Sequence, residues 1–120
     1  MTQNTRKLNE EGREMWDTKA AFWDELMGEE GNRFYRELIG PAMEALLDLQ
    51  AGERVLDVAC GSGILARRMA AQGAAVTAVD FSVEMLKQAQ ARGQSGGTPI
   101  RYLEADATDE EALAAFGEGT

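Results

Sequence analysis

The chain has 120 residues, a formal net charge of −9, one cysteine and no histidine. This acidity argues against a nucleic-acid partner, because binding a phosphate backbone requires a basic surface. The single cysteine excludes an internal disulfide and suits a reducing cytoplasm, and the lack of histidine disfavours a zinc site or a Ser/His hydrolase within the chain.

The first 50 residues are predicted to form a helical leader. Their apolar side chains recur at helical spacing in Trp16, Ala20, Trp23 and Met27. A second apolar cluster over 34–39 is expected to stop at Gly40-Pro41, where Pro41 would open a third helix. The start is polar and no segment approaches the roughly 20 apolar residues that span a bilayer, so we expect neither a secretory signal nor a membrane span.

The stretch Val55–Ala66 predicts a ligand-binding turn. A short apolar run over 54–58, interrupted by Asp57, is predicted to be a buried strand, and the glycine-bracketed turn 61–63 leads from it into a helix. Glycine removes the Cβ that would keep a ligand off the backbone, and the start of a helix offers unpaired N–H groups.

Two classes of cofactor fit this turn. Residues 61–66 satisfy the pattern G-x-G-x-x-[GA], in which bare N–H groups face the pyrophosphate of a dinucleotide. Asp57 would then lie close to that pyrophosphate, where like charges repel each other. The same carboxylate suits a ligand that carries an ammonium group, so the turn favours such a ligand over a nicotinamide dinucleotide.

Two further strands are predicted over 75–79 and 100–104, and an acid follows each of them. Asp80 comes about 20 residues after the glycine turn, where α/β nucleotide folds place an acid against ribose hydroxyls. Ser82 is expected to cap the next helix and Gly93 to end it. This alternation predicts an α/β fold with parallel strands in the order 3-2-1, joined by right-handed crossovers.

Three segments resemble those of the class I S-adenosylmethionine-dependent methyltransferases. Residues 55–63 resemble their motif I, residues 76–82 the motif that follows it, and residues 16–24 the leader of many small-molecule members. The resemblance, from about Trp16 to Phe116, implies a Rossmann-like, three-layer α/β/α domain that binds S-adenosyl-L-methionine. It also implies methyl transfer to a small-molecule acceptor, such as a quinone precursor, phenol, amine or lipid headgroup.

The same resemblance implies a set of cofactor-binding residues: Asp57, Ala59, Gly61, Gly63, Asp80, Phe81, Asp106, Ala107 and Trp23. Asp57 would hold the methionine end of the cofactor, directly or through water. The backbone from Ala59 to Gly63 would let the cofactor approach. Asp80 would accept hydrogen bonds from the ribose hydroxyls, its alternative role being a simple cap at the end of a strand.

The adenine would lie against Phe81, whose alternative role is that of a core side chain. Asp106 would accept a hydrogen bond from the exocyclic amine while the Ala107 N–H donates to a ring nitrogen. A capping box over 108–111 is expected to leave Asp106 free for this role. Trp23 either packs against the sheet or belongs to a lid that the leader helix forms over the cofactor.

Cys60 lies next to a helix start, where a thiol can become a nucleophile. In the resembling motif this position is small and often cysteine, and no histidine is present to activate it, so a structural role is favoured. No residue is assigned as a base for the acceptor.

The sequence divides into a helical leader or lid over 1–50 and the first half of a Rossmann-like domain over 51–120. The resembling domain has strands in the order 3-2-1-4-5-7-6, of which the first three are predicted here. We therefore expect a truncated chain that is inactive alone. It should either associate with a second copy through the edge of strand 1, as a homodimer, or be poorly soluble and partly unfolded. Two alternatives remain, an NAD(P)-binding oxidoreductase fragment and a non-catalytic remnant that acts as an interaction module.

Overall fold

The computed structural model describes residues 2–94 and 96–119. Its centre is a sheet of three parallel strands in the order β1-β2-β3, which confirms the predicted strands and their order. The predicted burial of the first strand is wrong, because it lies at the edge of the sheet and none of its residues is fully buried. Asp80 belongs to the second strand itself rather than following it. The strands are β1 (Arg54–Val58), β2 (Ala75–Asp80) and β3 (Arg101–Glu104).

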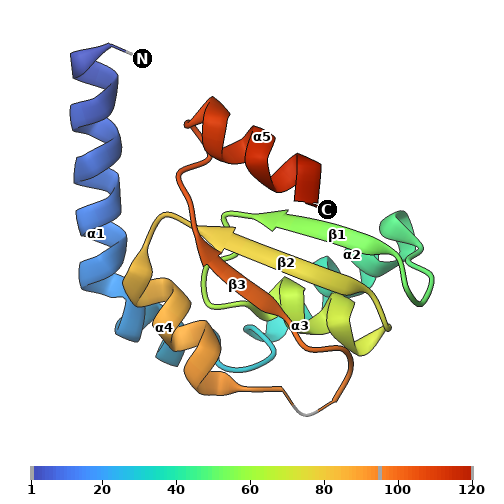
Figure 1. The fold of residues 1–120 in the computed structure, drawn as a ribbon. Helices are drawn as coiled ribbons and strands as arrows, with labels where there is room; N and C mark the ends of the chain where they lie inside the picture. Colours follow the sequence, from blue (N-terminus) through green and yellow to red (C-terminus); the bar gives the residue numbers. More distant parts are fainter. Residues whose placement is uncertain (1, 95, 120) are drawn as a thin grey trace.

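Helices lie on both sides of the sheet in Figure 1, with α3 and α4 below the strands and α5 above them. As predicted, the Ser82 hydroxyl caps α4 by accepting from the Met85 N–H, and Gly93 ends this helix. Among the described residues, no helix combines the length and the apolar character that a bilayer crossing requires. The helices are α1 (Gln3–Met27), α2 (Gly40–Leu47), α3 (Ile64–Ala71), α4 (Val83–Arg92) and α5 (Glu110–Gly119), with a π-helical turn η1 (Tyr35–Ile39) before α2.

The central strand β2 is covered on both faces, which explains its nearly continuous apolar sequence. Its residues 76–80 are all buried. Below it, α3 contributes Ala66, Met69 and Ala70 to the main core cluster, and the two small alanines let this helix come close to the strand. At the edge of the sheet, Val58 of β1 remains 43% exposed.

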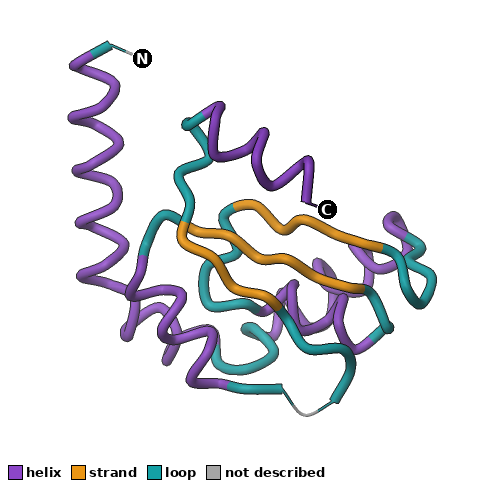
Figure 2. The backbone as a smooth tube through the Cα atoms, viewed as in Figure 1, coloured by secondary structure: helices purple, strands orange, loops and turns teal. Residues whose placement is uncertain are grey.

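The loops that leave the three strands lie at the same end of the sheet, beside α1 (Figures 1 and 2). Parallel strands bring their carboxyl ends together, and in α/β sheets ligands bind in the crevice outside these ends. Asp57 and Asp80 lie at this end of β1 and β2.

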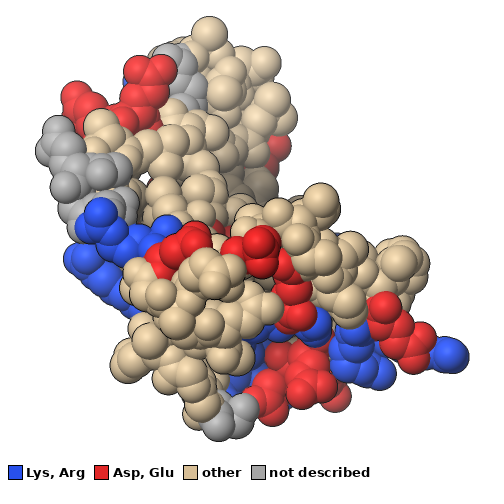
Figure 3. Space-filling model, turned by 90° about the vertical axis from the view of Figure 1, so that its right-hand side faces the viewer, with Lys and Arg blue, Asp and Glu red and all other residues tan. Residues whose placement is uncertain are grey.

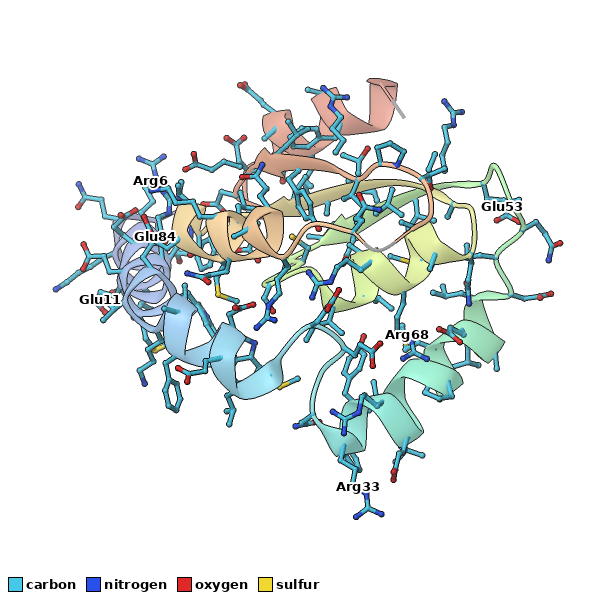
Figure 4. All side chains as sticks on the ribbon, turned by 90° about the horizontal axis from the view of Figure 1, so that it is seen from below. Arg6, Glu11, Arg33, Glu53, Arg68 and Glu84 are labelled. Atoms are coloured by element: carbon cyan, nitrogen blue, oxygen red, sulfur yellow. The ribbon has the colours of Figure 1, made fainter. Side chains whose placement is uncertain are left out.

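The predicted stop at Gly40-Pro41 is wrong, because the chain continues there as a helix. The Gly40 N–H donates to the Tyr35 carbonyl five residues back, which is the bonding pattern of a π-helix. Pro41 has no N–H to donate and is tolerated in the first turn of α2. Arg68 of α3, labelled in Figure 4, forms a 2.6 Å ion pair with Glu44, which fastens α2 to the domain.

Two polar contacts fix the leader helix α1 along α4. Asp17 accepts hydrogen bonds from the Ser82 hydroxyl at 2.5 Å and from the Glu84 backbone N–H at 3.3 Å. Near the other end of α4, Arg92 donates from Nε and Nη2 to the buried Asp24 carboxylate at 3.0 to 3.2 Å. The second half of α1 is therefore a packed part of the domain.

Candidate functional site

A cavity of about 580 Å³ opens at the carboxyl ends of β1 and β2, beside the leader helix. Gly63, Asp106 and Ala107 are not part of its wall. The structure thus brings together most of the predicted site residues, but not all of them. Those that line the cavity are Asp57, Ala59, Gly61, Asp80, Phe81 and Trp23.

The loop after β1 owes its shape to a left-handed backbone. Ala59, Gly61 and Gly63 have φ angles of 60°, 58° and 85°, a region that glycine adopts without strain. At Gly63 a Cβ would lie 2.8 Å from the Tyr102 hydroxyl oxygen of β3 and 3.1 Å from the Ala89 Cβ of α4. Gly63 therefore lets the loop pack against α4, whereas Ala59 and Gly61 face the cavity.

Asp57 places an unpaired carboxylate oxygen at the cavity. Its Oδ2 is buried and has no hydrogen-bond partner among the described residues, and the same holds for the Ser62 hydroxyl. Burial, with a further contribution from the nearby Asp80 carboxylate, raises the pKa of Asp57 from 3.8 to about 6. Because buried polar atoms are nearly always paired, this wall is suited to a ligand that is cationic or donates hydrogen bonds.

Asp80 shapes the loop in addition to lining the cavity. Its Oδ2 accepts from the Gly61 N–H at 2.8 Å, and its Oδ1 accepts from the Ser82 N–H at 2.9 Å. The residue is 7% exposed. An ionised carboxylate has about four acceptor positions, so each oxygen still has one for a ligand.

Asp106 lies in a second cavity, of about 660 Å³, together with residues of the first half of α1. Its Oδ1 accepts from the N–H and the hydroxyl of Thr108, and its Oδ2 accepts from the Asn9 amide. Burial acts to raise the pKa of Asp106, but the Thr108 and Asn9 hydrogen bonds and the Arg13 charge lower it below its ordinary value. Asp106 is therefore ionised and already bonded, rather than free.

The start of α5 explains this difference from the prediction. The expected capping box over 108–111 is wrong, because Asp109 is the residue that caps the helix. The Asp109 carboxylate accepts from the N–H groups of Glu111 and Ala112 at 3.0 and 3.3 Å. Thr108 lies one position earlier and donates to Asp106 instead.

Aromatic side chains form another part of the cavity wall. The rings of Trp16 and Trp23 meet edge to face, with their centroids 5.8 Å apart. Trp16, Met27 and Tyr35 also line the cavity, although the sequence did not assign them to it. Trp16 and Met27 belong to the helical stripe noted in the sequence, whereas Tyr35 is placed by the π-helical turn, which carried no recognised signal. Burial raises the pKa of Tyr35, so its hydroxyl remains a donor.

Cys60 is held in the loop as a structural residue. Its N–H donates to the Val79 carbonyl at 3.0 Å and ties the loop to β2. Burial, followed by the charges of Asp57 and Asp80, raises the pKa of the Cys60 thiol. The thiol therefore stays protonated, which disfavours the nucleophilic role.

Acidic and basic side chains are interspersed over the lower half of the face shown in Figure 3. This mixture differs from the continuous basic patch or stripe that nucleic-acid phosphates require. Within the part of the chain that the structure describes, no group of three or more His, Cys, Asp or Glu side chains is arranged to hold a metal ion.

Comparison with known proteins identifies related sequences. A family described as a methyltransferase domain matches residues 55–117, more than half of the chain. The ubiquinone biosynthesis O-methyltransferase of Paracidovorax citrulli (strain AAC00-1) is 48% identical over 77 residues, which cover 62% of this chain and 32% of that protein. The chain thus spans about a third of the length of this curated relative.

Solved structures share the fold. Magnesium protoporphyrin IX methyltransferase from Synechocystis PCC 6803 with bound S-adenosylhomocysteine (SAH) has a TM-score of 0.63 at 21% identity, over 82% of this chain and 51% of that one. The DhpI–SAH complex has a TM-score of 0.55 at 26% identity, over 82% of this chain and 45% of that one.

Proposed function

Because this chain belongs to the methyltransferase domain family, we propose that it binds S-adenosylmethionine and serves the transfer of a methyl group to a small molecule. The observation that carries the proposal is the cavity at the strand ends, which joins the unpaired Asp57 oxygen, the left-handed loop after β1 and the Phe81 ring. One elongated ligand would fit all three features, with a cationic group at Asp57, a middle part against the loop backbone and an aromatic ring on Phe81.

The residues present fit this cofactor. The unpaired Asp57 oxygen would accept from the ammonium group of the methionine end. Asp80 retains acceptor positions for the ribose hydroxyls, and Phe81 offers a flat apolar face to the adenine. When bound, the cofactor supplies a methyl group that its positively charged sulfur activates. The contribution of the chain is to bind and orient the reactants and to exclude water.

The adenine end of the site extends from Phe81 toward the start of α5. We assign Asp106 to the exocyclic amine and the Ala107 N–H to a ring nitrogen of the adenine. Both residues come just after β3, with Ala105 between the strand and Asp106, at the same end of the sheet as Asp57 and Asp80. Gly63 takes part through the packing that shapes the loop rather than through contact with the ligand.

A small aromatic acceptor, such as a quinone precursor, is supported by the cavity wall. Trp16, Trp23 and Tyr35 provide aromatic surface around the same space as Asp57. The Paracidovorax relative is named for ubiquinone biosynthesis. The formal net charge of −9 further supports a small molecule over a nucleic acid as the acceptor.

Association of two copies through β1 is supported by the edge of the sheet. Within the described residues, β1 pairs with β2 alone, and Val58 on this strand is 43% exposed. An unpaired strand edge is a template for pairing with another chain. Sedimentation velocity should therefore show a dimer, and a monomer at all concentrations would contradict this part of the proposal.

Isothermal titration with S-adenosylmethionine, SAH and NAD tests the proposed function. We expect the chain to bind the first two ligands and not NAD. Asp57→Asn should weaken SAH binding by roughly 1–3 kcal/mol, the value of a hydrogen bond to a charged group. Glu11→Gln removes a charge of the same sign from an exposed position on α1 and should leave the affinity unchanged.

Two results would contradict the proposal. Binding of NAD in preference to SAH would favour the oxidoreductase alternative. Binding of none of the three ligands by the folded chain would favour a non-catalytic interaction module.

A further inference from the structure

Arg13 lies between the two cavities at the adenine end of the site. Its guanidinium carbon lies over the Phe81 ring, 5.8 Å from the ring centroid, and its Nη2 is 3.8 Å from the Asp106 Oδ2. Phe81 lines the first cavity, whereas Arg13 and Asp106 line the second. The Arg13 Nε is buried without a hydrogen-bond partner among the described residues, so this side chain is not held by an optimal set of bonds.

The chemistry of the guanidinium resembles that of the base it would meet. An adenine that binds here needs a flat ring face on which to stack and an acceptor for its exocyclic amine. A guanidinium is also planar, and it also carries N–H donors at its edge. Arg13 therefore uses both groups, Phe81 and Asp106, that the proposed function assigns to the adenine.

We propose that Arg13 competes with the adenine of the cofactor for Phe81 and Asp106, so that cofactor binding displaces Arg13 and the first half of α1. The proposal rests on the proposed function, since it assumes an adenosine cofactor. Asn9 takes part in the same competition, because its amide also donates to the Asp106 carboxylate.

The helix is built so that one half can move without the other. The polar contacts to α4 and its N-cap come from Asp17 and Asp24, both in the second half of α1. The contacts to Asp106 come from residues 9 and 13. Gly12 lies within the first half, one residue before Arg13, and a glycine in the interior of a helix lowers the local stability of that helix. The first half can therefore yield while the second half stays on α4.

The size of the effect follows from the contacts that must be given up. A partly exposed ion pair and a cation–π contact each contribute modestly, and a ligand that displaces them loses affinity by the corresponding factor. We expect Arg13→Met to bind adenosine and SAH about five- to tenfold more tightly than the unsubstituted chain. Lys19→Met removes the same charge from an exposed position on α1 and should change neither affinity.

Two further measurements separate competition from a structural role. Inosine has a carbonyl oxygen in place of the amine of adenosine and cannot donate in the same way to Asp106, so Arg13→Met should improve its binding less. SAH should also speed amide hydrogen exchange over residues 3–13 of the unsubstituted chain, because these residues leave their contacts. Slower exchange there on SAH binding would overturn the displacement of α1.

The outcomes distinguish this proposal from the proposed function. If the unsubstituted chain binds SAH and the folded Arg13→Met variant binds adenosine equally or more weakly, competition by Arg13 is overturned and the proposed function stands. If the unsubstituted chain does not bind SAH, both are overturned. If circular dichroism shows that Arg13→Met does not fold, Arg13→Lys decides. This variant keeps the charge without the planar fork, so a smaller gain in affinity supports competition and no gain overturns it.

Discussion

Replacing Asp57 with asparagine should make the fold more stable at neutral pH, although Asp57 is assigned to the cofactor. Burial first, and the Asp80 charge second, raise the pKa of Asp57 from 3.8 to about 6. The unfolded chain lacks this environment, so there the carboxyl titrates near 3.8. Each pH unit between the two pKa values corresponds to about 1.4 kcal/mol, which gives an upper limit of about 3 kcal/mol.

The direction of this pH dependence follows from the pH at which Asp57 loses its proton in the folded and in the unfolded chain. Between pH 3.8 and about 6 the unfolded chain is ionised at Asp57 while the folded chain still keeps the proton. The free energy of unfolding therefore falls as the pH rises through this window and is constant with respect to this group above it. Asparagine does not ionise, so the variant lacks this loss of stability.

The assay is urea unfolding of both chains between about pH 4 and about pH 7. The free energy of unfolding of Asp57→Asn minus that of the unsubstituted chain should rise with pH by roughly 1–3 kcal/mol, because solvent screens part of the upper limit. The packing cost of the new amide does not depend on pH and drops out of the slope. A difference that varies by less than about 0.5 kcal/mol across the range would refute the reasoning.

Three other substitutions have expected outcomes. Gly63→Ala should lower the free energy of unfolding by roughly 1–3 kcal/mol, since its φ is 85° and its Cβ would be crowded; an unchanged melting temperature contradicts this. Arg92→Met should lower the free energy of unfolding in urea by roughly 1–3 kcal/mol, because the buried Asp24 carboxylate loses its charged partner. A decrease as small as that for an exposed ion pair argues against this contact as the one that holds α1 on α4. Asp80→Ala should weaken SAH binding by roughly 1–3 kcal/mol and speed hydrogen exchange at the Gly61 amide, because this amide donates to the Asp80 carboxylate. The assignment is contradicted if titration and exchange measurements show neither effect.

The strands and the site around their ends could be predicted because the responsible signals are local. The apolar sequence over 75–79 reflects a central strand that is buried on both faces. Once the strands are placed, parallel pairing brings Asp57 and Asp80 to the same end of the sheet without any knowledge of side-chain contacts. The glycine turn after β1 is local in the same sense, since its φ angles depend on its own residues.

The errors concern contacts between residues that are distant in the sequence. Asp106 was expected to be free, but Asn9, 97 positions earlier, donates to it. No local pattern indicates which face of α1 meets the start of α5. The π-helical turn was missed for a related reason. The sequence between Tyr35 and Gly40 suits an α-helical hydrogen-bond pattern as well as the π-helical one, and packing decides between them.

The apolar stripe of the leader helix did not predict whether this helix packs firmly on the domain or moves as a lid. The spacing of Trp16, Trp23 and Met27 indicates which face is buried, but it does not say how firmly each part of the helix is held. In the structure that firmness changes along the helix, because the ion pair of Asp24 with Arg92 secures its second half. The first half is held by polar contacts to Asp106, a group that the cofactor would also use. The same few contacts then set both the stability of this half and the access to the adenine end, so a change that strengthens them must weaken cofactor binding.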